Sequence, residues 1–219
     1  MRTWKRHGRG ERARFVAVLD PPEASVLRGL VGQVDDMLSG RADAAPNDEL
    51  STLTGIRTGP STPPDDPVLA RLLPDFHRPE ADPGSDRGRD AEGRDAEGRD
   101  AEGRDAEGSR PEGDPRDGAA LSAALRSVRE PELIEAKRDA IATLLASLPT
   151  GGGRVELTVP QAEAWLTAVN DVRLALGTAL EVSEDMPEQL PPDDPRSDHM
   201  PVYHWLTWLQ DSLVTVLMR

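Results

Sequence analysis

The clearest cluster of side chains that could hold a metal ion lies ahead of the last apolar segment. His199 and His204 are five residues apart and follow three aspartates, Asp193, Asp194 and Asp198. Imidazole and carboxylate groups are common ligands of divalent cations. Their spacing matches neither HExxH nor a calcium-binding loop, and acidic connecting segments contain such sets by chance. We therefore expect no metal site.

Other catalytic and cofactor-binding patterns are also missing from the sequence. Neither GxSxG nor GxGxxG occurs, and no Gly-Lys-Ser/Thr follows the glycine loop at Thr150–Gly153. No histidine stands beside a candidate nucleophile. The chain has no cysteine, which excludes disulfides, thiolate catalysis and cysteine-based zinc or iron–sulfur sites within it. We expect a protein that is not an enzyme and has no cofactor.

The charge is distributed unevenly along the chain. The formal net charge is −14, yet the first fourteen residues carry +5, which leaves −19 for the remainder. An acidic body disfavours general nucleic-acid binding. We expect residues 1–13 to be a flexible basic arm, although a contact of this arm with an acidic partner or nucleic acid stays open.

The apolar segments are too short or too interrupted for membrane insertion or secretion. Phe15–Leu19 is only five residues long and ends at Asp20, so it does not resemble the core of a secretory signal. The run Val202–Met218 is interrupted by Gln210 and Asp211. We expect a cytoplasmic protein that does not enter a membrane.

The strongest helical pattern is Gln161–Leu180. Its apolar positions form one arc, which predicts a central helix packed against several neighbours. Asn170, Arg173 and Gly177 share one flank of this helix. Arg173 should be partly desolvated there and needs a carboxylate or carbonyl partner, while Gly177 lets a second backbone approach. We interpret these three residues as a structural clamp between helices; a binding site is the alternative.

Further elements follow from capping signals and periodicity. The patterns predict two paired strands, Arg14–Leu19 and Arg154–Val159. They also predict a helix from Asp20 to its C-cap Gly40, a short helix at 66–73, a helical region at 119–149 interrupted by Pro131, and a last helix after Pro201. Lys137 falls within the apolar arc of the 119–149 region, where it either snorkels to solvent or pairs with a buried carboxylate.

Low complexity marks residues 79–117, which contain four GRDAE repeats and no large apolar side chain. Such a segment cannot offset the entropy of ordering. We therefore expect a single helical domain over 14–219, interrupted by a disordered insertion at 79–117. Its fold class should be mainly α, with about five helices around the central one and a minor two-stranded β element.

The last helix offers the best candidate interface. Trp208 lies on the side opposite the core stripe, together with His204 and Asp211. An exposed tryptophan on a helix is a frequent anchor of protein–protein contacts. The alternative is that another helix or loop covers it.

Four stretches carry a family resemblance: LTVPQAEAWLTAVNDVRLALG at 157–177, VYHWLTWLQDSLV at 202–214, DPVLARLLPDFHR at 66–78 and LDPPEASVLRGLV at 19–31. In these stretches the chain resembles an actinobacterial family of domains of unknown function, DUF2017, which includes the actinomycete oxidative stress regulator. The resemblance covers most of the chain outside the repeats. It implies a cytoplasmic helical protein that acts through partners, in one branch as a redox-responsive regulator of transcription that senses oxidation through cysteines.

Because this chain has no cysteine, a thiol switch does not transfer to it. Our hypothesis is a non-enzymatic regulatory protein that binds another protein through the residues around Trp208, with transcription or a stress response as the candidate processes. The first alternative is an adaptor or accessory factor in proteolysis and protein quality control, which family gene neighbourhoods imply. A more distant alternative is a hydrolase or a metal-dependent enzyme. Self-association stays open.

Overall fold

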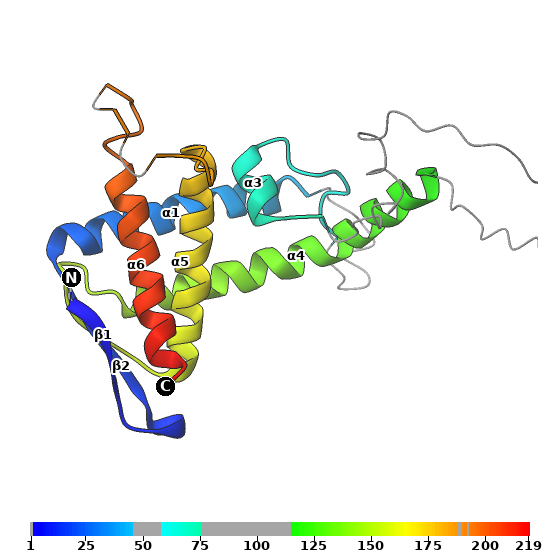
Figure 1. Cartoon of the computed structure of the whole chain (residues 1–219). Helices are drawn as coiled ribbons and strands as arrows, with labels where there is room; N and C mark the ends of the chain where they lie inside the picture. Colours follow the sequence, from blue (N-terminus) through cyan, green and yellow to red (C-terminus); the bar gives the residue numbers. More distant parts are fainter. Residues whose placement is uncertain (1, 46–57, 76–114, 188–189, 192) are drawn as a thin grey trace, which may run out of the picture.

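The central element of the structure is helix α5, Val159–Ala179, around which the other elements are arranged (Figure 1). The computed structural model describes residues 2–45, 58–75, 115–187, 190–191 and 193–219. The expected insertion at 79–117 therefore lies outside the described residues, except that a helix begins at Pro115. The remaining elements are, in chain order, β1 (Arg2–His7), the 3-10 turn η1 (Gly10–Arg12), β2 (Arg14–Leu19), α1 (Pro21–Asp43), α3 (Pro67–Leu72), α4 (Pro115–Ser147), β3 (Gly153–Leu157) and α6 (Met200–Leu217).

The sheet has three antiparallel strands in the order β1-β2-β3. The predicted pairing of β2 with β3 is confirmed, with Phe15 opposite Leu157 and Leu19 opposite Gly153. The prediction of only two strands, with residues 1–13 as a flexible arm, is wrong, because β1 pairs with β2. Trp4 explains the difference: its side chain is 2% exposed and packs edge-on against Trp165, with 5.5 Å between ring centroids. Burial of a tryptophan stabilises a strand whose other residues are polar.

Capping signals fix where two helices begin. At α1, the Asp20 side chain accepts from the backbone of Glu23, whose carboxylate in turn accepts from the Asp20 N–H at 2.7 Å, which is the expected capping box. The helix then continues through Gly40 to Asp43, so Gly40 is not its C-cap. A second capping box, between Thr158 and Gln161, begins α5, and β3 therefore ends at Leu157 rather than at the expected Val159.

Helix α4 continues through Pro131, where the sequence predicts a break. Proline has no N–H to donate to the carbonyl four residues earlier, that of Ser127. In the structure the Gly59 N–H donates to this carbonyl at 2.7 Å. A Cβ on Gly59 would lie 2.9 Å from Pro131 Cγ, so the close approach requires glycine. The chain segment before α3 thus satisfies the carbonyl that the proline leaves free.

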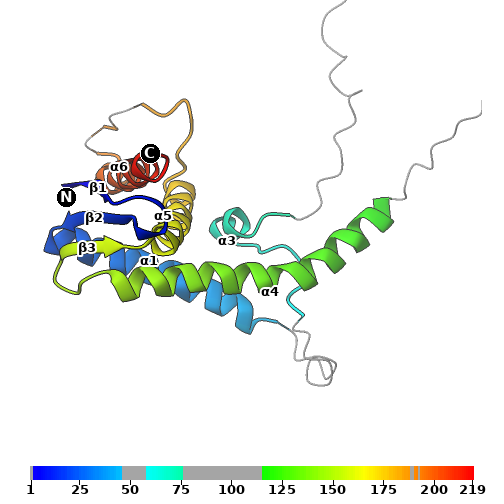
Figure 2. The same cartoon turned by 90° about the horizontal axis from the view of Figure 1, so that it is seen from below.

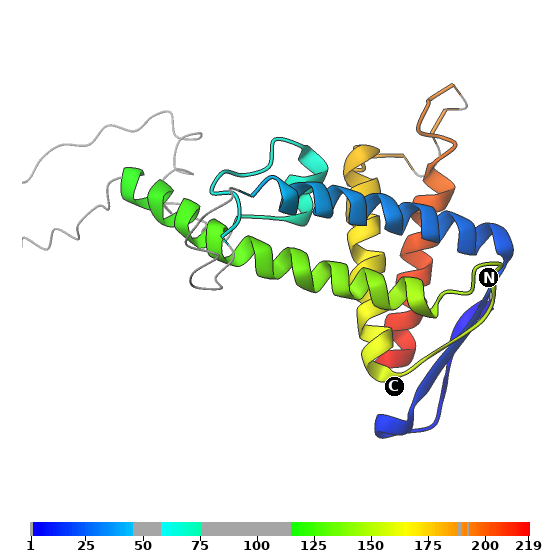
Figure 3. The ribbon, with the colours of Figure 1, turned by 180° about the vertical axis from the view of Figure 1, so that it is seen from behind.

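The helices pack on α5 from different sides. Helices α1 and α4 lie beside each other and both contact α5, whereas α6 packs along α5 and against β1 (Figures 2 and 3). The predicted short helix is confirmed as α3, whose N-cap Asp66 accepts from the Leu69 N–H and which also contacts α5. The expected mainly helical fold around a central helix is confirmed. Within the described residues, no helix has the length and apolar character needed to cross a membrane.

Candidate interaction site

The predicted clamp residues lie together between α5 and α6. Arg173 Nε donates to Gln210 Oε1 at 2.9 Å, and an Arg173 terminal nitrogen donates to Asn170 Oδ1 at 3.3 Å. Gln210 Nε2 also donates to Asn170 Oδ1, at 3.3 Å. The partner of Arg173 is thus an amide, not a carboxylate. Sequence reasoning did not select Gln210, because nothing in its local pattern indicates that it faces Arg173.

Gly177 lies one helical turn beyond Arg173 and faces the same neighbour. A Cβ on Gly177 would lie 3.0 Å from Cε2 of Tyr203, near the start of α6. The glycine therefore allows the tyrosine ring to approach α5 closely. Asn170, Arg173 and Gly177 are half-buried, and each contacts or closely approaches a residue of α6.

The opposite side of α6 faces solvent. We define the Trp208 face as the exposed residues of α6 and the adjoining Met218: Pro201, His204, Thr207, Trp208, Asp211, Thr215 and Met218. Trp208 is 40% exposed, so the described part of the chain does not cover it. Asp211 is the single Asp, Glu, Lys or Arg residue of this face. A tryptophan on a face with so few charges has the composition of an interface core.

Two members of the predicted histidine and aspartate cluster, Asp194 and His204, have other neighbours. Asp194 accepts two hydrogen bonds from the Arg196 guanidinium, at 2.8 and 3.0 Å, and these bonds lower the pKa of Asp194 to about 2. The His204 ring lies 6.1 Å from the Tyr203 ring. Across the described ranges, no three histidine, aspartate or glutamate side chains gather in a way that could hold a metal ion.

A buried polar network that the sequence did not reveal connects α1 with α4. Glu130 is fully buried and accepts from Arg41 and from Arg126, both at 2.6 Å. Arg126, 3% exposed, also pairs with Asp75, and Arg41 donates to the Thr62 carbonyl at 2.5 Å. The only local feature of the sequence that indicates this network is the four-residue spacing of Arg126 and Glu130 on one helix. The network ties the segments on either side of α3 to α4.

Lys137 pairs with a buried carboxylate rather than extending to solvent. Its ammonium lies 2.6 Å from Oδ1 of Asp171 on α5, which is 2% exposed. Burial raises the pKa of Asp171 above its ordinary value, and the hydrogen bond from Lys137 opposes that rise. The second oxygen of Asp171 has no hydrogen-bond partner among the described residues. This pair connects α4 with α5.

None of these polar groups forms a constellation for catalysis. Contacts between helices occur in all three groups: Arg173 with Gln210, Arg41 with Glu130, and Lys137 with Asp171. The feature that remains available to a second molecule on α6 is the Trp208 face.

Comparison with known proteins agrees with the resemblance seen in the sequence. The model of the family described as "Domain of unknown function (DUF2017)" matches residues 1–217. The chain belongs to this family. Relatives named "Oxidative stress regulator AosR", from Mycobacterium bovis and Mycobacterium tuberculosis, are 43% identical over 222 residues, covering 100% of this chain and 88% of theirs. A "Putative oxidative stress regulator AosR" from Mycobacterium leprae is 42% identical, covering 100% and 89%. No solved structure matches the chain.

Proposed function

We propose that this DUF2017 protein is a non-catalytic regulator in a stress response and that it acts by binding another protein through the Trp208 face. Support for the regulatory role comes from the relatives named oxidative stress regulators, which are 42–43% identical over the whole chain. Because the chain has no cysteine, its response does not use a thiol switch within these 219 residues. Regulation then depends on which partner is bound.

The proposal that a partner binds to the Trp208 face rests on the exposure of Trp208. On the core side of α6, Leu206, Leu209 and Leu213 are at most 1% exposed, whereas Trp208 on the other side is 40% exposed. Leaving a large aromatic side chain in water has a cost that a partner removes by covering it. Tryptophan is also over-represented among residues whose truncation weakens binding by 2 kcal/mol or more.

The test is an affinity capture from the native host with the wild type, Trp208→Ala and Val26→Ala. Val26 is a matched control because it is also 40% exposed but lies on α1. Circular dichroism and melting temperature first establish that all three proteins fold equally well. We expect a partner that the wild type and Val26→Ala retain and that Trp208→Ala loses. Equal recovery with all three proteins would show that this face is not the binding site.

The identity of the captured protein decides the pathway. A component of the transcription machinery agrees with regulation at the level of transcription. A protease subunit or chaperone, without any transcription protein, would instead favour the adaptor role in proteolysis. Capture of nothing by the wild type would contradict the binding proposal.

A further inference from the structure

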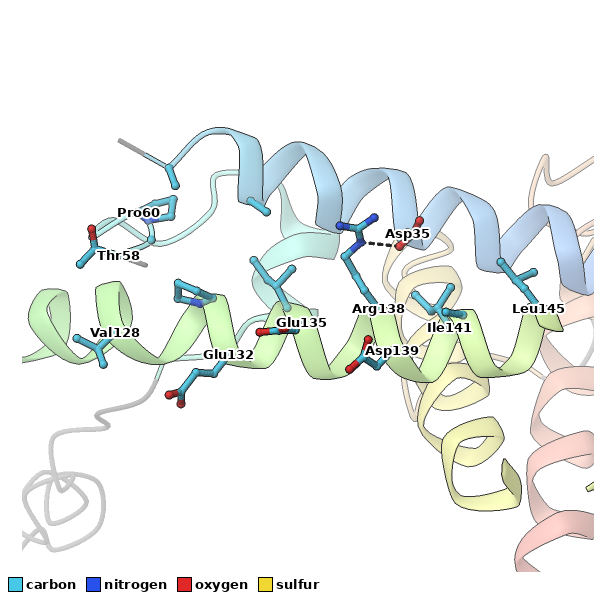
Figure 4. A pocket seen from close by; sticks show the side chains of 16 residues that line it. Asp35, Thr58, Pro60, Val128, Glu132, Glu135, Arg138, Asp139, Ile141 and Leu145 are labelled. Carbon is cyan, nitrogen blue, oxygen red and sulfur yellow. Dashed lines mark hydrogen bonds and ion pairs between the residues drawn. The ribbon is translucent and has the colours of Figure 1, made fainter. Parts of the chain in front are cut away.

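A long groove runs over the surface between α1 and α4 (Figure 4) and contains no residue of the Trp208 face in its lining. Its volume is about 940 Å³, and its apolar lining includes Ala42, Val128, Pro131, Ile134, Ala142 and Leu145; we call it the α1–α4 groove. Ile134 is buried at its floor, whereas Val128 is 48% exposed at its end. Helix α6 packs on α5 and β1 and takes no part in this lining.

The length of the groove suits a helix. Its lining positions recur along one side of α4 from Val128 to Leu145, which at 1.5 Å per residue is roughly 25 Å, or between four and five helical turns. Small side chains, including Ala42 on α1 and Ala142 on α4, line both sides of the groove, so neither side projects far above its floor. A long groove with an apolar floor is a common binding site for the apolar face of an amphipathic helix.

The charges of the lining are mostly negative. Glu132, Glu135 and Asp139 stand along α4, and the one cation among the lining residues, Arg138, is held by Asp35 across the groove at 2.8 Å (Figure 4). Glu132 contacts Arg129 at 3.3 Å, but both side chains are more than 60% exposed, so this pair neutralises little. Carboxylates beside an apolar floor favour a ligand with cationic residues next to its apolar stripe.

The described helices of a second copy do not include such a helix. In α1, α5 and α6 the acidic residues outnumber the basic ones, in α4 their numbers are equal, and α3, which carries Arg71 and no acidic residue, is only six residues long. The net charge of −14 also opposes close approach of two copies. Nucleic acid is excluded from this groove by the same sign of charge.

We propose that the α1–α4 groove binds a basic amphipathic helix of a partner protein. The apolar residues of that helix pack on the exposed side chain of Val128 and the half-buried side chains of Pro131 and Leu145, and its Lys or Arg residues approach Glu135 and Asp139. This site is independent of the Trp208 face, so the chain has two separate surfaces with which to join two proteins.

The test uses a synthetic 16-residue peptide with Leu and Lys at helical spacing, and a scrambled peptide of the same composition. Binding to the full chain is followed by fluorescence anisotropy of the labelled peptide at low and high salt. Glu135→Lys is compared with Glu163→Lys, which makes the same charge change at an exposed site on α5. Val128→Ser is compared with Val26→Ser, which removes the same type of side chain, 40% exposed against 48% for Val128, on α1 outside the groove.

We expect Glu135→Lys to weaken peptide binding about tenfold and Val128→Ser to weaken it severalfold, while both controls and Trp208→Ala stay within about twofold of the wild type. Equal binding of the scrambled peptide, or equal weakening by Glu163→Lys, would overturn the proposal in favour of general attraction to an acidic protein. A wild-type dimer in sedimentation that Val128→Ser dissociates would overturn it in favour of a second copy.

Discussion

Replacing Lys137 with methionine should destabilise the protein strongly, because it leaves a carboxylate buried without its cation. Lys137 is 12% exposed and Asp171 is 3% exposed as side chains, and their 2.6 Å contact joins α4 to α5. Methionine keeps the length and the apolar stem of the lysine but removes the ammonium. Breaking a buried pair from one side typically costs about 3–5 kcal/mol of unfolding free energy. We expect Lys137→Met to lose that amount at pH 7.5.

The pH dependence of this loss has a definite sign. Burial already raises the pKa of Asp171 in the folded protein, and without Lys137 the rise is larger. A carboxyl group whose pKa is higher in the folded state than in the unfolded state binds its proton more tightly in the folded protein. Such a group lowers the free energy of unfolding at pH values above its folded pKa. This destabilisation disappears as the pH falls to the unfolded pKa. The gap between wild type and Lys137→Met should therefore narrow as the pH falls from 7.5 towards about 4.

Urea denaturation measures both effects. The double variant Lys137→Met/Asp171→Leu replaces the pair by apolar side chains and should recover to within about 1 kcal/mol of the wild type, without the pH dependence. Arg129→Ala is the control, because its contact with Glu132 is exposed and should matter by less than about 0.5 kcal/mol. A Lys137→Met protein as stable as Arg129→Ala would refute our account of the buried pair.

Three further substitutions test other contacts through thermal or urea unfolding. Gly59→Ala should cost about 1–3 kcal/mol, because its Cβ meets Pro131 at 2.9 Å; no loss would mean that this approach is not needed to keep α4 continuous. Trp4→Ala should cost about 3–5 kcal/mol, since its buried indole anchors β1; a loss below 1 kcal/mol would indicate a loosely held strand. Arg173→Ala should cost about 1–2 kcal/mol, because its partner Gln210 is neutral, whereas 3 kcal/mol or more would indicate a buried ion pair.

The elements that local sequence predicts are those whose signals are complete within one segment. The Asp20–Glu23 capping box and the apolar stripe after it give the start of α1, and the apolar arc of 161–180 gives α5. The β2–β3 pairing followed from two short β-rich runs. The start of α5 was obscured because the alternation of RVELTV extends over Thr158, whose Thr-x-x-Gln spacing marks the capping box.

The predictions that failed concern residues whose structure depends on a contact with a residue distant in sequence. Residues 1–13 look like a solvated arm until Trp165 is placed against Trp4. Pro131 looks like a helix break until Gly59 donates to the carbonyl that the proline leaves free. For the site, exposure of Trp208 followed from the helical wheel, but Gln210 as partner of Arg173 required the packing of α6 on α5. The α1–α4 groove likewise exists only once two helices lie side by side.

The central claim, that this protein acts by binding another protein through the Trp208 face, is tested most directly by measuring the affinity of the captured partner. Purified partner is titrated into wild type, Trp208→Ala and Val26→Ala by isothermal calorimetry. We predict that Trp208→Ala weakens binding by about 2 kcal/mol or more, or roughly 30-fold in Kd, while Val26→Ala changes it less than twofold. Equal affinity of all three proteins would contradict the claim.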